Sequence, residues 1–146
     1  MPTAGKLAAA LLFAALAWYA SQLIKPKFPE AFDPGWFAEV NAAVGLILGW
    51  RLAGPRAGTG YTDAIGYGLT TIIAITFVAL FLHCFAEMIR MSLDRRYDGP
   101  VEGVTDVFTQ MYEYGRLLID PTIIGTLLIG GILAGIVTEV FGRSFR

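Results

Sequence analysis

The stretch from Leu69 to Met91, LTTIIAITFVALFLHCFAEMIRM, places the strongest constraint on how this chain can fold. Its first half is almost purely apolar, and its last turns carry His83, Glu87 and Arg90. At about 1.5 Å per residue, a helix of this length can cross a hydrocarbon core of about 30 Å. Residues three or four apart share one face of a helix. We therefore predict a transmembrane helix with one polar stripe near its end.

Composition supports a membrane protein and argues against other classes. Hydrophobic residues make up 55% of the 146 residues, and charged residues only 16%, against about 25% in soluble domains. The formal net charge of −1 provides no basic face, so nucleic acid is not an expected partner. The chain has one histidine and one cysteine, too few for a protein-built zinc site, a disulfide or a bis-histidine haem.

Three further apolar stretches are long enough, or nearly so, to span a bilayer. Proline disfavours helix in the residue before it, so Lys25-Pro26 ends the first of these stretches. Asp33-Pro34 and Asp120-Pro121 resemble helix starts, with a capping aspartate followed by proline at the first helical position. The four predicted spans cover about residues 4–24, 36–53, 63–91 and 121–141. A secretory signal cleaved near Ala15-Leu16-Ala17 is the rival interpretation of the first stretch, but its only basic residue is Lys6. We favour a retained helix.

A helix of different character is predicted between the third and fourth spans, over about residues 101–119. Its apolar positions are spaced by three and four, as in an amphipathic helix: Val101, Val104, Phe108, Met111, Gly115 and Leu118. The opposite positions are polar: Glu102, Asp106, Gln110, Glu113 and Arg116. The helix is acidic, which makes it a poor binder of anionic lipid by charge. We expect it to lie at the membrane interface or across the mouth of the bundle.

Small residues spaced by four form stripes on the second and fourth spans. Gly45 and Gly49 follow Asn41 on one span, and Gly131 and Gly135 lead to Glu139 on the other. Such stripes let two helix backbones approach closely in lipid. We predict that these two spans pack against each other, or against a second copy, through their glycines.

The glycine-rich segment 53–61, AGPRAGTGY, allows two interpretations. One is a loop that cradles phosphate, but no Gly-Lys-Ser/Thr sequence and no preceding strand accompany it. The other is a tight connection between two spans, which we favour.

Ionisable residues inside a membrane are candidate functional sites because each is costly there. The candidate intramembrane polar cluster comprises four residues: His83, Glu87, Arg90 and Glu139. It could serve as a proton or oxyanion relay, or it could form structural ion pairs near the interface, which is the interpretation we favour. Cys84 could bind or reduce an oxyanion as a thiolate, but a thiol in apolar surroundings is usually inert.

Four runs of this chain have a distinctive sequence: GWFAEVNAAVGLILGWRLAGPRAGTGY, FAEMIRMSLDRRYDGPVEGVTDVFTQMYEYG, IGGILAGIVTE and the opening MPTAGKL. Together they resemble the TrgA-type tellurium resistance proteins of alphaproteobacteria. The resemblance covers nearly the whole chain, with RRYDGP its most specific part. It implies a small integral membrane protein linked to tellurite resistance, and it carries over no catalytic residues.

The expected fold is therefore an all-α integral membrane protein, with four transmembrane helices and one amphipathic interfacial helix in a single domain, residues 1–146. We expect no enzyme activity, no cofactor and no metal. The favoured function is a non-catalytic contribution to oxyanion tolerance; an accessory or assembly subunit of a larger membrane complex is the alternative, and a membrane reductase lacks ligands for a cofactor. We expect the inner membrane as location, cytoplasmic termini, and self-association or another membrane protein as partner.

Overall fold

The computed structural model describes residues 4–27, 37–93 and 99–144, and these residues form helices joined by short turns. The α-helices are α1 (Ala4–Ile24), α2 (Phe37–Leu48), α3 (Tyr61–Leu93), α4 (Pro100–Leu118) and α5 (Pro121–Ser144). A short 3-10 turn, Lys25–Lys27, follows α1, and the end of α2 continues through a π-helical segment, Gly49–Ala53, into a 3-10 turn, Gly54–Arg56. The predicted all-helical fold is confirmed for this part of the chain.

Three of the described helices are long and apolar enough to cross a membrane: α1 with 21 residues, α3 with 33 and α5 with 24. They correspond to the first, third and fourth predicted spans. The second predicted span, 36–53, is not one long α-helix, because α2 has only 12 residues before the backbone changes to π-helix at Gly49. Trp36, and the predicted helix start at Asp33-Pro34, lie outside the described residues.

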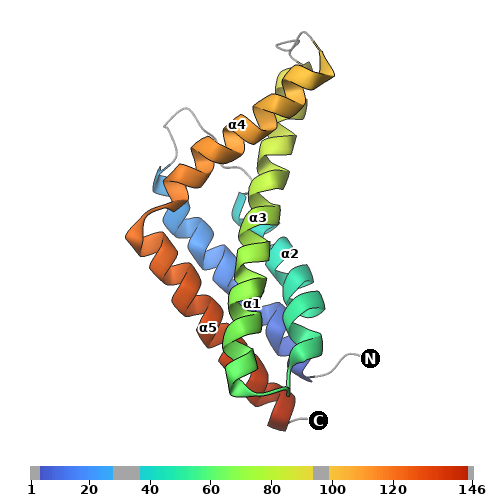
Figure 1. Ribbon diagram of the computed structural model, residues 1–146, viewed down its shortest axis with the longest axis vertical. Helices are drawn as coiled ribbons and strands as arrows, with labels where there is room; N and C mark the ends of the chain where they lie inside the picture. Colours follow the sequence, from blue (N-terminus) through green and yellow to red (C-terminus); the bar gives the residue numbers. More distant parts are fainter. Residues whose placement is uncertain (1–3, 28–36, 94–98, 145–146) are drawn as a thin grey trace.

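The helices form an elongated bundle in which the start of α1 and the end of α5 lie at the same end (Figure 1). α1 packs against α2 and α5, and α3 packs against α5, α4 and α2. α3 extends beyond the other long helices, and α4 runs back obliquely from the far end of α3 to the turn that leads into α5 (Figure 1). At that turn the side chain of Asp120 accepts a hydrogen bond from the Thr122 backbone N–H at 2.9 Å, as its capping position predicts.

Both glycine stripes lie in helix contacts, but the predicted pairing between them is wrong. A Cβ at Gly45 of α2, or at Gly49 where the π-helical segment begins, would overlap the backbone of α1, near Phe13 and Ala9 respectively. On α5, a Cβ at Gly135 would overlap the carbonyl oxygen of Ala64 in α3. Small residues thus bring α2 against α1 and α5 against α3. In the second contact α3 supplies a glycine of its own, Gly68, which faces Gly131 and Gly135.

α4 forms as predicted, within one residue at each end, but its buried face differs from the predicted apolar stripe. Val101, Val104 and Phe108 are exposed, with Val101 78% exposed. The buried positions are instead Gly103, Val107 and Gln110. α4 therefore packs on α3 through a face of small and mixed residues, which leaves the first half of its predicted apolar stripe pointing outward.

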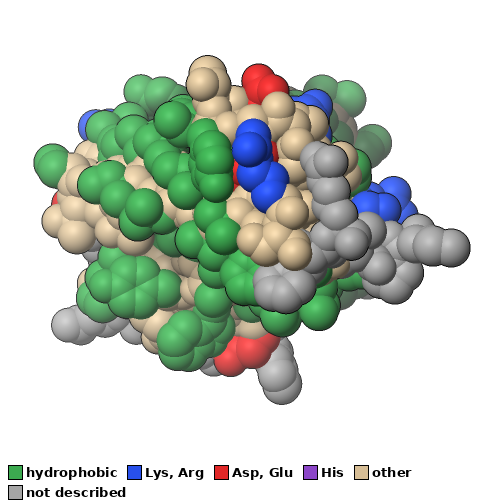
Figure 2. Space-filling view, turned by 90° about the horizontal axis from the view of Figure 1, so that it is seen from below, with side chains coloured by type: hydrophobic (Ala, Val, Ile, Leu, Met, Phe, Trp, Pro, Cys, Tyr) green, Lys and Arg blue, Asp and Glu red, His purple; other side chains and the backbone are tan. Residues whose placement is uncertain are grey.

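The outer surface of the bundle is rich in large apolar side chains. Ile73 and Phe77 on α3 and Ile129 on α5 are each 62% exposed. Buried polar side chains lie inside the bundle: Ser21, Asn41, Thr71, Gln110, Thr138 and Glu139. Figure 2, which views the molecule from the lower end, shows hydrophobic side chains over much of the visible surface. Apolar groups outside and polar groups inside are the distribution expected when the surroundings are lipid.

Candidate functional site

Glu139 has the most completely satisfied polar environment among the predicted site residues. It lies near the end of α5 with its side chain fully buried. Its Oε1 accepts hydrogen bonds from the Gly60 N–H at 2.7 Å and from Arg143 Nε at 2.9 Å. Its Oε2 accepts from the Gly58 N–H at 2.8 Å and from the Tyr67 hydroxyl at 2.9 Å. One carboxylate therefore ties together α5, α3 and the connection between α2 and α3.

The sequence of that connection explains how its N–H groups reach the carboxylate. Gly58 and Gly60 have φ angles of 98° and 142°, a backbone region that residues other than glycine rarely adopt. These conformations turn both N–H groups inward toward Glu139. The segment considered above as a phosphate cradle thus uses its N–H groups on a carboxylate of its own chain. Ala57 closes the same end of the bundle by packing between Gly5 of α1 and Gly142 of α5.

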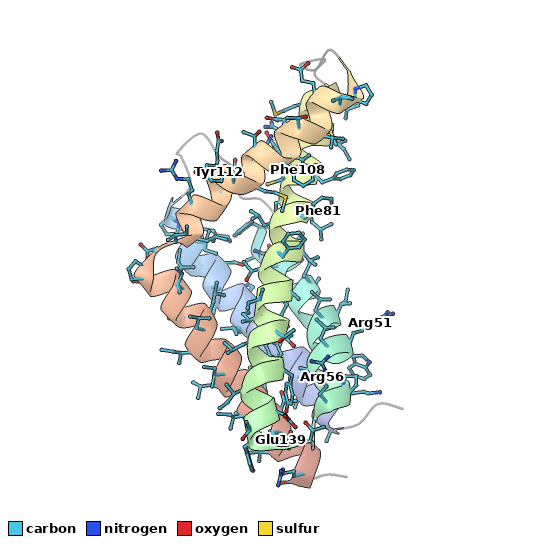
Figure 3. The ribbon with its side chains drawn as sticks, in the orientation of Figure 1. Arg51, Arg56, Phe81, Phe108, Tyr112 and Glu139 are labelled. Atoms are coloured by element: carbon cyan, nitrogen blue, oxygen red, sulfur yellow. The ribbon has the colours of Figure 1, made fainter. Side chains whose placement is uncertain are left out.

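Arg143 extends from this buried carboxylate to the surface. Its guanidinium carbon lies 4.8 Å from the centre of the Tyr61 ring, in cation–π geometry. We name Glu139, Tyr67, Arg143 and the Gly58 and Gly60 N–H groups the carboxylate clamp. Glu139 lies at the lower end of the bundle, far along the molecule from Phe81 of α3 (Figure 3). No side chain of the clamp lines the cavity that the other three predicted site residues share, so the clamp is a separate site.

His83, Glu87 and Arg90 do share one side of α3, and all three line a cavity of about 510 Å³. Arg90 donates to Glu87 through Nε at 3.0 Å and through a second guanidinium nitrogen, so the pair is bidentate. The Arg90 side chain is 69% exposed and that of Glu87 26%, which places the pair at the mouth of the cavity. Exposed ion pairs of this kind contribute little to stability.

His83 lies deeper and joins a hydrogen-bond chain across three helices. Its Nε2 lies 2.8 Å from Oδ1 of Asn41 in α2, and Asn41 Nδ2 donates to Ser21 Oγ in α1 at 2.8 Å. Ser21 Oγ in turn donates to the Ala17 carbonyl at 2.7 Å. An amide oxygen can only accept, so Nε2 of His83 is the donor. The Phe37 ring packs on the imidazole with centroids 4.6 Å apart.

The remaining candidate, Cys84, does not line the cavity. Its side chain is 1% exposed and packs in the interior beside α4. Tyr114 of α4 does line the cavity, and burial, with the nearby Glu87 carboxylate, raises the pKa of its phenol. Among the described residues, no three His, Cys, Asp or Glu side chains gather closely enough to hold a metal ion.

Sequence reasoning missed several members of these two sites. Tyr67 and the donors Gly58 and Gly60 were not expected near Glu139, since about 70 to 80 residues of chain separate them from it. The sequence pattern marks Asn41 only as the polar end of a glycine stripe. A lone amide in an apolar span was the available signal, because it needs a polar partner on another helix.

Comparisons with protein-family models, with curated proteins and with solved structures gave no match to this chain.

Proposed function

We propose that this protein is a four-span protein of the bacterial inner membrane that contributes to tolerance of an oxyanion such as tellurite without catalysing a reaction. The family resemblance supplies the oxyanion. The observation that carries the non-catalytic role is the carboxylate clamp: the only fully buried carboxylate of the described residues already accepts four hydrogen bonds from its own chain. A carboxylate so engaged holds helices in place and is not poised to exchange protons or bind an anion.

The packing of α2 supports a fourth span. The helical path continues from α2 through Gly49–Ala53 to Arg56, and its glycines hold it against α1 over most of this length. Residues 37–56 rise far enough to cross most of a hydrocarbon core at about 1.5 Å per residue. We propose that the π-helical segment is accepted in the bilayer because α1 covers the backbone there.

The outward face of α4 supports a position at the membrane interface. Exposed Phe108 and Tyr112 lie on the same helix as exposed Glu102, Glu113 and Arg116 (Figure 3). Aromatic rings and charged groups are both accommodated at the headgroup level. We propose that α4 rests there, with the start of α1 and the end of α5 at the cytoplasmic face. An alkaline phosphatase fusion after Arg146 should be inactive, and an active fusion would reverse the orientation.

The growth experiment compares tellurite tolerance with protein abundance in a strain lacking the gene. Wild type, Glu139→Gln, Glu87→Gln and Cys84→Ser are expressed from the same promoter, and growth is scored over a tellurite series beside immunoblots of the membrane fraction. We expect tolerance to follow abundance: Glu139→Gln lowers both, and the other two lower neither. Lost tolerance at normal abundance in Glu87→Gln or Cys84→Ser would overturn the non-catalytic role.

The alternative function, an accessory subunit of a larger membrane complex, is favoured by one feature. The end of α3 and the start of α4 project beyond the other helices (Figure 1), and Leu93 and Val101 there are 79% and 78% exposed. Purification in mild detergent at native expression distinguishes the two functions. A stoichiometric partner of different sequence, lost in a Leu93→Glu variant, would favour the accessory role; its absence would favour the first proposal.

A further inference from the structure

The cavity of about 510 Å³ beside α3 has the size and lining of a small-molecule site. Ligand pockets in proteins span roughly 300–1,000 Å³ and combine apolar walls with a few placed polar groups. Here α1, α3, α4 and α5 supply the apolar walls, with Ala17, Ile72, Ile75, Leu80, Leu118 and Leu127 among their residues. The polar groups gather toward one end, around His83 and the Glu87–Arg90 pair.

The hydrogen-bond chain that holds His83 also determines what its other nitrogen can do. Because Nε2 donates to Asn41, the neutral imidazole carries no proton on Nδ1, which is then an acceptor. Among the described residues, no group donates to that nitrogen, although His83 lines the cavity. A molecule in the cavity that carries a hydroxyl group can therefore donate to Nδ1, and a molecule with only acceptors cannot.

The charges at the mouth argue for a neutral occupant. Glu87 and Arg90 form a bidentate pair of opposite charge, so the pair adds no net charge to the lining. The raised pKa of Tyr114 keeps its phenol protonated near neutral pH. An anion such as tellurite would meet no uncompensated positive charge at this pair, whereas a neutral molecule needs none.

The ring of Phe37 next to His83 favours an aromatic body for the occupant. The two rings have centroids 4.6 Å apart and an interplanar angle of 39°, and both line the same cavity. An aromatic ring placed there gains offset or edge contacts beyond the apolar area that it buries. An aliphatic chain of the same size would gain the burial alone.

We propose that this cavity binds a neutral, membrane-soluble aromatic alcohol, the chemical class of alkylphenols and quinols, whose hydroxyl donates to Nδ1 of His83 and whose apolar body packs against Ile72, Ile75 and Leu127. The proposal goes beyond the function in oxyanion tolerance and does not depend on it.

The single histidine of the chain makes a direct experiment possible. Protein with ¹⁵N-labelled histidine, purified through a histidine-free tag and placed in nanodiscs, is titrated with 4-hexylphenol and, separately, with 4-hexylanisole, in which a methyl group replaces the hydroxyl proton. We expect a saturable upfield shift of the Nδ1 resonance with the phenol and none with the anisole. No saturable shift with the phenol, or the same shift with both probes, would overturn the proposal.

Two variants with a matched control locate the response in the cavity. Ala79→Phe fills the cavity from α3, and Ala86→Leu narrows it at an exposed position that folding tolerates more readily. Ile73→Phe adds the same ring on the outer face of α3, away from the cavity. We expect either cavity variant that folds to bind 4-hexylphenol about tenfold more weakly, as measured by the concentration that gives half of the Nδ1 shift. Ile73→Phe should leave that concentration unchanged. Equal responses in all three variants would place the probe elsewhere and overturn the proposal.

A third probe tests the aromatic class against lipid. 1-Monooleoylglycerol carries hydroxyl groups on an aliphatic body. We expect it to shift the Nδ1 resonance only at much higher concentration than 4-hexylphenol. An equal, saturable shift at equal concentration would show that the cavity takes hydroxylated lipid, and it would overturn the assignment to an aromatic alcohol.

Discussion

The hydroxyl of Tyr67 donates a hydrogen bond to Oε2 of Glu139, with the two oxygens 2.9 Å apart in the interior of the bundle. The same hydroxyl lies 3.1 Å from the carbonyl oxygen of Gly135, but it has one proton, and the charged carboxylate is the stronger acceptor. This contact joins α3 to α5 at the end where the α2–α3 connection also reaches the carboxylate. The acceptor at the centre of the clamp is thus shared by three parts of the chain.

Glu139→Gln should strongly destabilise the protein. A glutamine has one acceptor oxygen and a donor amide, so at least one of the four donors would face another donor in a buried site. We expect a loss of roughly 2–4 kcal/mol in the free energy of unfolding, as for buried charged groups that lose a partner. The measurement is thermal unfolding in dodecyl maltoside, followed by intrinsic fluorescence.

Glu87→Gln is the matched control for that prediction. It makes the same chemical change in a carboxylate that also pairs with an arginine on its own helix, but at an exposed pair. Such a pair contributes about 0–1 kcal/mol, so the unfolding midpoint should stay nearly unchanged. Equal midpoints for Glu139→Gln and Glu87→Gln would contradict a structural role for the clamp.

Gly135→Ala should weaken the contact between α5 and α3. The added methyl group would overlap the carbonyl oxygen of Ala64, which belongs to backbone and cannot easily move aside. We expect a loss of about 1–3 kcal/mol from overpacking. Gly125→Ala, in the same helix, meets no atom within 4 Å and should instead stabilise by up to about 1 kcal/mol. Similar unfolding midpoints for the two variants would show that the α5 glycines do not face a helix.

Asn41→Leu should destabilise the bundle through the hydrogen-bond chain. It removes the acceptor of the His83 N–H and the donor to Ser21 while keeping a side chain of similar size. We expect a loss of about 1–3 kcal/mol, because the His83 donor stays buried without its partner. Thr76→Val is the control, since the Thr76 hydroxyl bonds only the Ile72 carbonyl of its own helix. If both variants unfold at the wild-type temperature, the chain across three helices does not contribute to stability.

Cys84 should react slowly with thiol reagents in the folded protein. Its side chain is 1% exposed, and thiol reagents need an accessible thiolate. In detergent, N-ethylmaleimide should label Cys84 far more slowly than a cysteine at Leu93, a position that is 79% exposed, placed in a Cys84→Ser background. Both should react fast after unfolding. Equal rates in the folded proteins would mean that Cys84 is accessible and open to oxyanion chemistry.

Helix positions were predictable where local signals determine them. The first span was predicted at 4–24 and forms as Ala4–Ile24, and the fourth begins at Pro121 because Asp120 caps it. Apolar length alone identified α3. The second span was less predictable, since the change to π-helix occurs at Gly49, where the backbone lies close against α1, and no sequence signal marks it.

The periodicity of apolar residues did not indicate which helix faces are buried or which residues surround Glu139 and His83. The stripe through Val101, Val104 and Phe108 was an apolar face, but a protein in lipid can turn such a face outward, so apolar character does not identify the buried side. Likewise Glu139 and His83 are ionisable residues in largely apolar spans. Each needed a partner, and the fold supplied Tyr67 and Asn41 from helices far away in the chain.

The most direct measurement of whether this bundle lies in a membrane is the surroundings of Phe77, which is 62% exposed on the outer face of α3. A nitroxide attached to Phe77→Cys in a Cys84→Ser background, in reconstituted bilayers, is exposed to oxygen and to a water-soluble nickel chelate. If the outer face lies in lipid, oxygen will relax the label far more than the nickel chelate does, because oxygen partitions into hydrocarbon. Stronger relaxation by the nickel chelate would place this face in water and would contradict the membrane-spanning bundle.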